Sequence, residues 1–112
     1  MSGEFCTRSC VPCQGGIPPL SEAEARALMP QVPEWTLAEG GRRLRRRIAF
    51  PDFRTALAFV SRLGELAERE GHHPDISFGW GWAEIVWSTH EIDGLHENDF
   101  IMAARTSRLL DG

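Results

Sequence analysis

The chain has 112 residues, of which 42% are apolar and 25% charged, and this balance predicts one globular domain with a modest core rather than a disordered segment. The formal net charge of -4 argues against a nucleic-acid partner held mainly through its phosphates. No apolar run approaches the roughly 20 residues of a membrane span, and the start "MSGEFCTRSC" lacks the basic and apolar regions of a secretory signal. We therefore expect a cytoplasmic protein with no membrane partner.

All three cysteines, Cys6, Cys10 and Cys13, lie near the start of the chain. Cys10 and Cys13 form a C-x-x-C pair, which leaves three interpretations open: a tail without chemistry, a metal clip or a thiol switch. Structural zinc usually takes four ligands, so a zinc site here would need a histidine or a second chain. We expect residues 1–20 to be an extension of a domain that spans residues 21–112.

A short helix and a hairpin are predicted first. Ser21 followed three residues later by Glu24 forms a capping box, which predicts a helix that runs to Pro30. The stretch "EWTLAEGGRRLRRRIAF" then predicts two strands joined at Gly40 and Gly41, because a glycine turn between two β-like runs is typical of a hairpin.

The second strand of this hairpin is rich in arginine. Its apolar residues share one parity and most of its arginines take the other, as in a strand with one buried and one charged face. The apolar set is Leu44, Ile48 and Phe50, with Arg46 among them, and the opposite set is Arg43, Arg45 and Arg47. A solvated strand face is the default interpretation, and a basic patch for an anionic partner is the alternative.

The apolar period changes at Pro51. Proline at a first helical position, followed by Asp52, predicts a helix start, and Gly71 predicts the helix end. Between them, apolar residues recur every three or four positions, which predicts the core helix of the domain. These residues are Phe53, Ala56, Leu57, Val60, Leu63 and Ala67.

A second hairpin and a last helix complete the chain. "DISFGWGWAEIVWSTH" predicts two strands that turn near Gly79 to Gly81, and "HENDFIMAARTSRLL" predicts a helix with acidic residues in its first turn. Apolar residues occur on both faces of this hairpin, so we expect another subunit to cover the face that the helices leave open. The element order predicts an α+β fold, a four-stranded antiparallel sheet with helices packed on one face.

Side chains that can do chemistry collect where these elements end. Glu68, His72 and His73 lie at the exit of the long helix, His90 follows the last strand, and Asp99 lies in the first turn of the last helix. If these ends converge, they form a cleft with three imidazoles. Acid–base catalysis suits such a set best, because imidazole titrates near neutral pH.

Three other interpretations of these residues stay open. A metal site is disfavoured because the adjacent side chains of His72 and His73 diverge in extended backbone, whereas helical zinc sites use histidines four residues apart. Nucleophilic catalysis needs a serine or cysteine beside a base, and nothing marks Ser88 as one. The histidines could also be solvated surface side chains.

Several segments together resemble the pterin-4a-carbinolamine dehydratase family over about residues 21–112. They are "EWTL", "FPDF", "EREGHHP", "STHE", "GL" and "ENDF", in the family's order and spacing. The resemblance implies a cofactor-free enzyme that removes water from 4a-hydroxytetrahydropterin (4a-hydroxytetrahydrobiopterin) to give quinonoid dihydropterin. It also implies tetrahydropterin recycling for an aromatic amino-acid hydroxylase, and a homodimer or homotetramer of the same α+β fold.

The resemblance also implies roles for individual residues. The catalytic residues would be His72, His73, His90 and Asp99. The substrate-binding residues would be Trp35, Glu68, Gly71, Pro74, Ser88, Thr89 and Glu91, with no metal ligand. His72 and His90 would share the acid and base roles, in an order that the sequence does not assign, while Asp99 would hold a histidine tautomer.

One residue departs from the family pattern. His96 stands where serine or threonine often caps the last helix, and histidine is a poorer cap, which puts the placement of Asp99 in question. Two alternative functions remain: a pterin-binding or dehydratase role in molybdenum-cofactor metabolism, and a non-catalytic role in stabilising the dimer of a transcription factor. The intact set of His72, His73 and His90 favours an enzyme.

Overall fold

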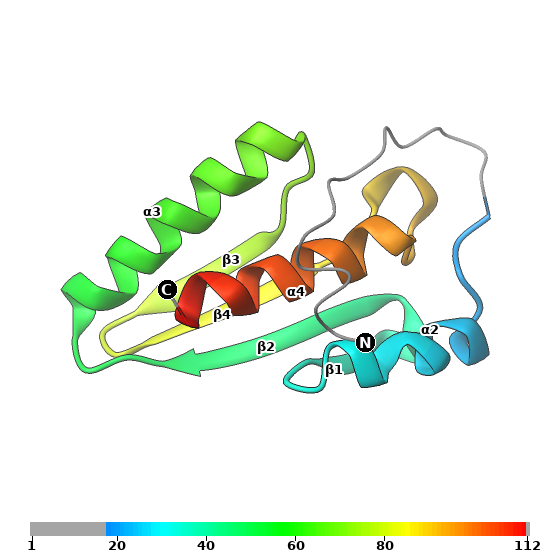
Figure 1. The fold of residues 1–112 in the computed structure, drawn as a ribbon, viewed down its shortest axis with the longest axis horizontal. Helices are drawn as coiled ribbons and strands as arrows, with labels where there is room; N and C mark the ends of the chain where they lie inside the picture. Colours follow the sequence, from blue (N-terminus) through cyan, green and yellow to red (C-terminus); the bar gives the residue numbers. More distant parts are fainter. Residues whose placement is uncertain (1–17, 112) are drawn as a thin grey trace.

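The computed structural model describes residues 18–111, so Cys6, Cys10 and Cys13 lie outside the described residues. Figure 1 shows the elements along the chain. They are α2 (Glu22–Leu28), the 3-10 turn η1 (Met29–Gln31), β1 (Thr36–Ala38), the 3-10 turn η2 (Glu39–Gly41), β2 (Arg43–Ala49), α3 (Phe53–Glu70), β3 (Asp75–Gly79), β4 (Trp82–Trp87), the 3-10 turn η3 (His90–Ile92) and α4 (Glu97–Asp111). None of the helices within residues 18–111 is long and apolar enough to cross a membrane.

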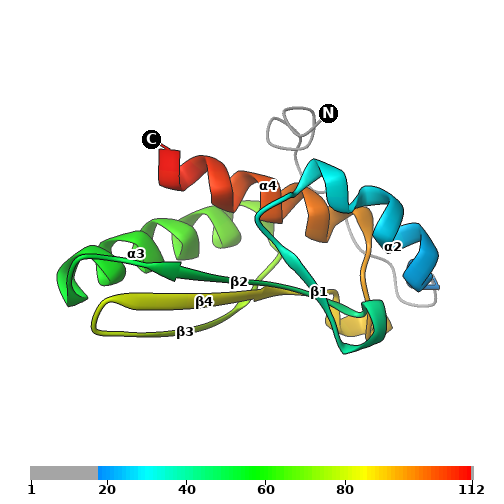
Figure 2. The same cartoon turned by 90° about the horizontal axis from the view of Figure 1, so that it is seen from below.

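The four strands form one antiparallel sheet in the order β1-β2-β4-β3. The first hairpin turns through η2 and the second at Trp80 and Gly81, close to the predicted glycines. Figure 2 shows that α2, α3 and α4 all lie on one side of the sheet. The predicted α+β fold, a four-stranded antiparallel sheet with helices on one face, is therefore confirmed.

Strand β2 has the two faces that its sequence predicts. Leu44 and Ile48 are buried under the helices, whereas Arg45 and Arg47 are exposed on the opposite face. On that open face the guanidinium of Arg47 lies 4.3 Å from the ring centroid of Trp82, so a cation–π contact within the chain leaves this tryptophan only half exposed. Coverage of the open face by another subunit stays a prediction.

Helix α3 begins two residues later than predicted. Asp52, not Pro51, defines the start, because the Asp52 carboxylate accepts a hydrogen bond of 2.8 Å from the backbone N–H of Thr55 and so serves as the N-cap. Pro51 precedes the cap instead of opening the helix.

The predicted capping box of α2 is confirmed, since the Ser21 hydroxyl accepts from Glu24 N–H and the Glu24 carboxylate accepts from Ser21 N–H.

The buried face of α3 is rotated from the predicted one. Phe53 and Leu57 are each 43% exposed, although their spacing suggested the core. Apolar residues cover more than one side of this helix, and the sheet buries only the side that faces it. The side chains on that buried face are Ala56, Phe59, Leu63, Leu66 and Ala67.

We expect the two leucines of α3 to differ in their contribution to stability. Leu63→Ala removes a fully buried side chain and should lower the free energy of unfolding by about 2 to 5 kcal/mol. Leu57→Ala, the matched control on the exposed side, should change it by about 0.5 kcal/mol or less. Urea unfolding followed by circular dichroism measures both, and equal losses would contradict this assignment of the core face.

The N-cap of α3 should make stability depend on acid pH. Hydrogen bonds from the Thr55 side chain and backbone hold the pKa of Asp52 below its ordinary value of 3.8. A carboxyl whose pKa falls on folding stabilises the fold above its unfolded pKa, and this contribution is lost as pH falls through the folded pKa. Asp52→Asn should therefore destabilise the protein by a constant amount above about pH 5, and by less at lower pH. Unfolding free energies of both proteins across this range test the prediction, which a difference that grows with acidity would exclude.

Candidate active site

The two adjacent histidines follow the C-terminal cap of α3. Gly71 adopts a left-handed conformation with φ 65°, and the N–H groups of Gly71 and His72 donate back to the carbonyls of Glu68 and Ala67. Glycine suits this position because a Cβ atom is unfavourable at positive φ. Beyond this cap the two imidazoles separate: His72 is buried and His73 is exposed.

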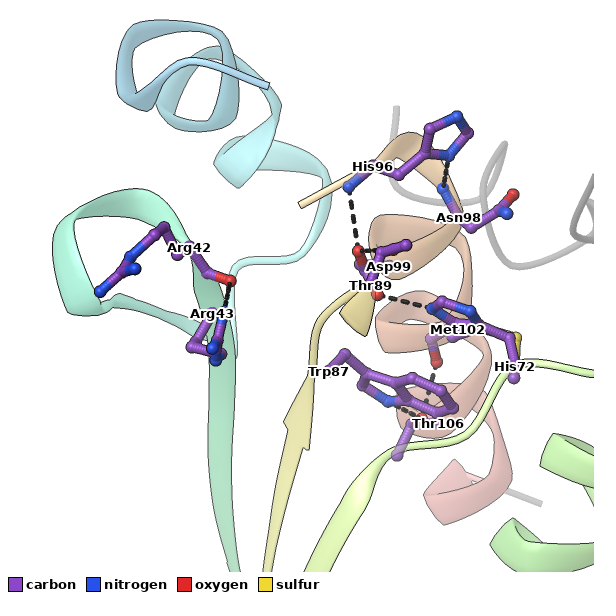
Figure 3. Close-up of polar contacts among 10 residues, drawn as sticks. All are labelled: Arg42, Arg43, His72, Trp87, Thr89, His96, Asn98, Asp99, Met102 and Thr106. Atoms are coloured by element: carbon purple, nitrogen blue, oxygen red, sulfur yellow. Dashed lines mark hydrogen bonds and ion pairs between the residues drawn. The ribbon is translucent and has the colours of Figure 1, made fainter. Parts of the chain in front are cut away.

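His72 forms a buried contact with the carboxylate of Asp99. The His72 Nε2 atom lies 2.6 Å from Asp99 Oδ1, and Asp99 is fully buried in the first turn of α4. The other oxygen, Oδ2, accepts from the Thr89 hydroxyl at 2.8 Å and from the His96 backbone N–H at 2.9 Å. Figure 3 shows the three donors around the carboxylate. Because a carboxylate can only accept, Nε2 of His72 carries a proton and Nδ1 is its remaining site for proton transfer.

The start of α4 is capped by an imidazole. Nδ1 of His96 accepts a hydrogen bond of 3.1 Å from Asn98 N–H, while the Asp99 carboxylate accepts from His96 N–H. This resembles a capping box with histidine in place of serine or threonine, except that the imidazole accepts from Asn98, the second helical residue, while the N–H of Asp99, the third, donates to the His96 carbonyl. The doubt that the sequence raised about the cap is therefore resolved, and His96 contributes to the placement of Asp99.

A tryptophan supports the imidazole of His72 from the sheet. The rings of His72 and Trp87 are stacked, with an interplanar angle of 5° and centroids 5.5 Å apart. The Trp87 indole N–H donates to the Thr106 hydroxyl at 3.0 Å, and that hydroxyl donates to the Met102 carbonyl at 2.6 Å (Figure 3). Trp87 on strand β4 therefore fixes the plane of the His72 ring, and Asp99 on helix α4 fixes the position of its Nε2 atom.

A pocket of about 180 Å³ opens beside these residues. Its walls come from the α3–β3 connection, the first residue of β3, and the segment after β4. The lining residues are Gly71, His72, His73, Pro74, Asp75, Ser88, His90 and Glu91. Among residues 18–111, the side chains of Asp75, His90 and Glu91 form no hydrogen bond or ion pair, so they can bind a ligand.

Most of the residues predicted for the site lie in or around this pocket. Glu68 forms a hydrogen bond with His73 at the rim, and both side chains are exposed. Thr89 and Asp99 lie behind the pocket and contact it through His72. The pocket also includes Asp75, which we did not predict, although its position directly after the rigid Pro74 was a usable signal.

Trp35 is the predicted site residue that the structure does not bring to the pocket. It is 4% exposed, and its indole N–H donates to the Ser107 hydroxyl on α4 at 3.0 Å. Arg46 Nη1 donates to the same hydroxyl at 2.7 Å. In this chain Trp35 therefore packs β1 against α4, and its predicted contact with a ligand finds no support in the pocket.

The arrangement can hold a small ligand and move protons. Two imidazoles face the pocket at its rim, a third is fixed by a carboxylate, and the carboxylates of Asp75 and Glu91 line the pocket as acceptors for a ligand. Within residues 18–111, no three His, Cys, Asp or Glu side chains are placed to hold a metal ion together.

Comparison with known proteins identifies the family of the chain. The family model described as pterin 4 alpha carbinolamine dehydratase matches residues 18–109. The chain belongs to this family. It is 56% identical over 109 residues to a protein of Aromatoleum aromaticum, with 97% of each chain covered, and 55% identical over 112 residues to one of Cupriavidus pinatubonensis, with 100% of this chain and 97% of the relative covered. Both relatives carry the provisional name pterin-4-alpha-carbinolamine dehydratase.

Two solved structures of pterin dehydratase-like proteins share the fold. A transcriptional coactivator/pterin dehydratase from Brucella melitensis matches with a TM-score of 0.76 and 26% identity, over 81% of this chain and 97% of that one. A pterin dehydratase-like protein identified as a RuBisCO assembly factor in the alpha-carboxysome matches with a TM-score of 0.59 and 28% identity, over 68% of this chain and 88% of that one. The fold therefore occurs in proteins with different described roles.

The hydroxyl of Thr89 should stabilise the buried carboxylate. Thr89→Val keeps the shape of the side chain but removes one of the three donors to Asp99, and an unmet hydrogen bond of a buried polar group costs about 1 to 3 kcal/mol. We expect that loss in the free energy of unfolding, measured in urea. The control Thr36→Val, at an exposed position of β1, should change it by about 0.5 kcal/mol or less. A Thr89→Val protein as stable as this control would show that Asp99 does not need the hydroxyl.

Proposed function

We propose that this family member is a dehydratase that converts a 4a-hydroxytetrahydropterin into quinonoid dihydropterin and water. The observation that carries the proposal is the His72–Asp99 pair, buried behind a pocket whose rim holds His73 and His90. A role in binding alone would not require an imidazole fixed by a buried carboxylate. Family membership supports the class of reaction.

The reaction needs one proton delivered and one removed. The C4a–O bond breaks, its electron pair leaves on the oxygen, and a proton delivered to that oxygen releases water. The lone pair of the neighbouring ring nitrogen forms the C4a=N double bond, and this nitrogen then loses its proton to a base. The reaction involves no net oxidation or reduction, so a pair of acid–base groups is sufficient for it.

The structure suggests which histidine takes each role. His72 has its Nε2 bound to Asp99, so a proton from the ring nitrogen would add at Nδ1, and the carboxylate would stabilise the resulting imidazolium, as in other His–Asp pairs. His90 is exposed and its imidazole has no partner among residues 18–111, so it can take a proton from solvent and deliver it to the hydroxyl. We therefore assign His72 as the base and His90 as the acid.

The rim of the pocket would orient the pterin. The pyrimidine ring of a pterin has an amino group and ring N–H groups, which donate hydrogen bonds. The carboxylates of Asp75 and Glu91 line the pocket and are available as acceptors. Glu68 would hold the imidazole of His73 against one side of the ligand. This orientation would place the C4a hydroxyl between His72 and His90.

Such a dehydratase would act in tetrahydropterin recycling, where an aromatic amino-acid hydroxylase supplies the carbinolamine. The alternative is a non-catalytic role as a dimerisation or interaction protein. The likeness to the Brucella melitensis protein supports it, because that protein is described as a transcriptional coactivator as well as a pterin dehydratase. A direct rate measurement separates the two functions, since only an enzyme accelerates loss of the carbinolamine.

The single variants His72→Ala and His90→Ala test the assignment. Each should lower kcat by about 10²- to 10⁴-fold, the usual contribution of one positioned proton donor or acceptor. Stopped-flow absorbance of 4a-hydroxytetrahydropterin, generated in the instrument, gives the rate. The control Arg26→Gln, which breaks an exposed ion pair with Glu22 on α2, should match the wild type.

Two results would overturn the proposal. A wild-type rate equal to that in buffer would exclude the dehydratase function itself. Histidine variants that are folded by circular dichroism and as fast as the wild type would leave the enzyme in place but remove His72 and His90 from its mechanism.

A further inference from the structure

The segment after β4 carries one wall of the pocket on a short loop. Thr89 and Gly94 pair across its base, with N···O distances of 2.8 and 3.4 Å, and four residues, 90–93, lie between them. His90 and Glu91, on the first half of this loop, line the pocket with exposed side chains. Their positions therefore depend on what holds the loop.

The base of the loop is held within the fold. The Thr89 hydroxyl donates to Asp99, and the Leu20 N–H donates to the Leu95 carbonyl at 2.8 Å. Gly94 lies so close to Pro19 that a Cβ atom on it would come within 2.5 Å of the proline ring. These contacts fix the two ends of the loop but do not reach His90 and Glu91.

The second half of the loop is anchored by Asp93. Its Oδ2 atom lies 3.2 Å from Arg42 Nη1, and its Oδ1 atom lies 3.0 Å from Arg43 Nη2. The two guanidiniums are themselves held by carbonyls, because Arg42 Nε donates to Glu39 O at 3.1 Å and Arg43 Nη1 donates to Arg42 O at 2.9 Å. Each carboxylate oxygen therefore meets an arginine that the first hairpin has already oriented.

The backbone of Asp93 also shapes the loop. It has φ 47° and ψ 50°, a left-handed conformation that aspartate and asparagine tolerate better than most residues, and its N–H donates to the His90 carbonyl at 3.2 Å. The carboxylate is charged at neutral pH, since the hydrogen bond from Arg43 and the charge of Arg42 lower the pKa of Asp93. The anchor thus combines a backbone turn with two ion pairs.

We propose that Asp93 is a positioning residue for the active site, which fixes the loop bearing His90 and Glu91 to the start of β2 through Arg42 and Arg43. The arginines that begin the basic strand would then serve the site from a distance, without touching the ligand. The catalytic part of this inference rests on the proposed function, whereas the anchoring part does not.

Two substitutions separate the charge from the backbone. Asp93→Asn keeps a residue that tolerates the left-handed conformation but removes the negative charge, and Asp93→Gly keeps the conformation while removing the whole side chain. Arg26→Gln, which breaks the exposed pair with Glu22 on α2, is the control for loss of an ion pair away from the loop.

Amide hydrogen exchange tests the anchor without any ligand. In Asp93→Asn, exchange at residues 92–94, corrected for intrinsic rates, should rise about two- to fivefold, the factor expected from exposed ion pairs. Amides of α3 and β2 should keep their wild-type rates, and the Arg26→Gln protein should show no change in the loop. At about 1 M salt, where the screening length is about 3 Å, the difference between Asp93→Asn and wild type should shrink.

Kinetics test the connection to the site. Per folded molecule, kcat/KM of Asp93→Asn should fall by up to about fivefold, because a loop that opens more often holds His90 and Glu91 at the pocket for less of the time. A residue that served only stability would change the folded fraction and leave kcat/KM per folded molecule unchanged.

Hydrogen exchange and kinetics can each contradict a different part of the proposal. Wild-type exchange in the Asp93→Asn loop, with faster exchange only in Asp93→Gly, would show that the backbone alone holds the loop and would overturn the proposal. Faster exchange with unchanged kcat/KM would confine Asp93 to loop stability and remove its positioning role. A wild-type protein without dehydratase activity would overturn the proposed function, and exchange alone would then decide whether Asp93 anchors the loop.

Discussion

The buried contact between His72 and Asp99 is the interaction on which the site depends. A carboxylate without exposure to water needs hydrogen-bond donors, and Asp99 obtains them from three separate segments of the chain. The exit of α3 provides His72, the segment after β4 provides Thr89, and the cap of α4 provides the His96 N–H. Satisfying one buried charge therefore brings together the chain segments that surround the pocket.

The same constraint separates the two adjacent histidines. His72 is held by Asp99 and stacked on Trp87, whereas the only side chain bound to His73 within residues 18–111 is the exposed Glu68. An imidazole fixed in plane and tautomer suits proton transfer at one defined nitrogen, and a solvated one suits contact with a ligand. A half-buried ion pair of 2.8 Å between Glu70 and Arg105 ties the end of α3 to α4 and keeps this arrangement in place.

The arginine-rich strand β2 has a solvated face, which its sequence pattern predicts, and internal contacts, which the pattern does not predict. Arg45 is exposed on the open face of the sheet, as a solvated strand face predicts. Its neighbours contact side chains from other elements of the fold: Arg43 pairs with Asp93, Arg46 donates to Ser107, and Arg47 lies over Trp82. Most of the positive charge of this strand therefore contributes to internal contacts that the sequence pattern does not identify.

The sequence by itself determined the α+β architecture, the capping box of α2, the glycine exit of α3 and the position of the histidine pair just after that exit. These features depend on residues within a few positions of one another, so periodicity and capping rules apply to them directly. Tertiary structure decided which side of α3 is buried, the place of Trp35 in the core, and the contacts of His96 and Asp93. Each of these features depends on contacts with residues distant in the chain, or on a local backbone geometry that several kinds of side chain could adopt. A short-range sequence pattern identifies neither.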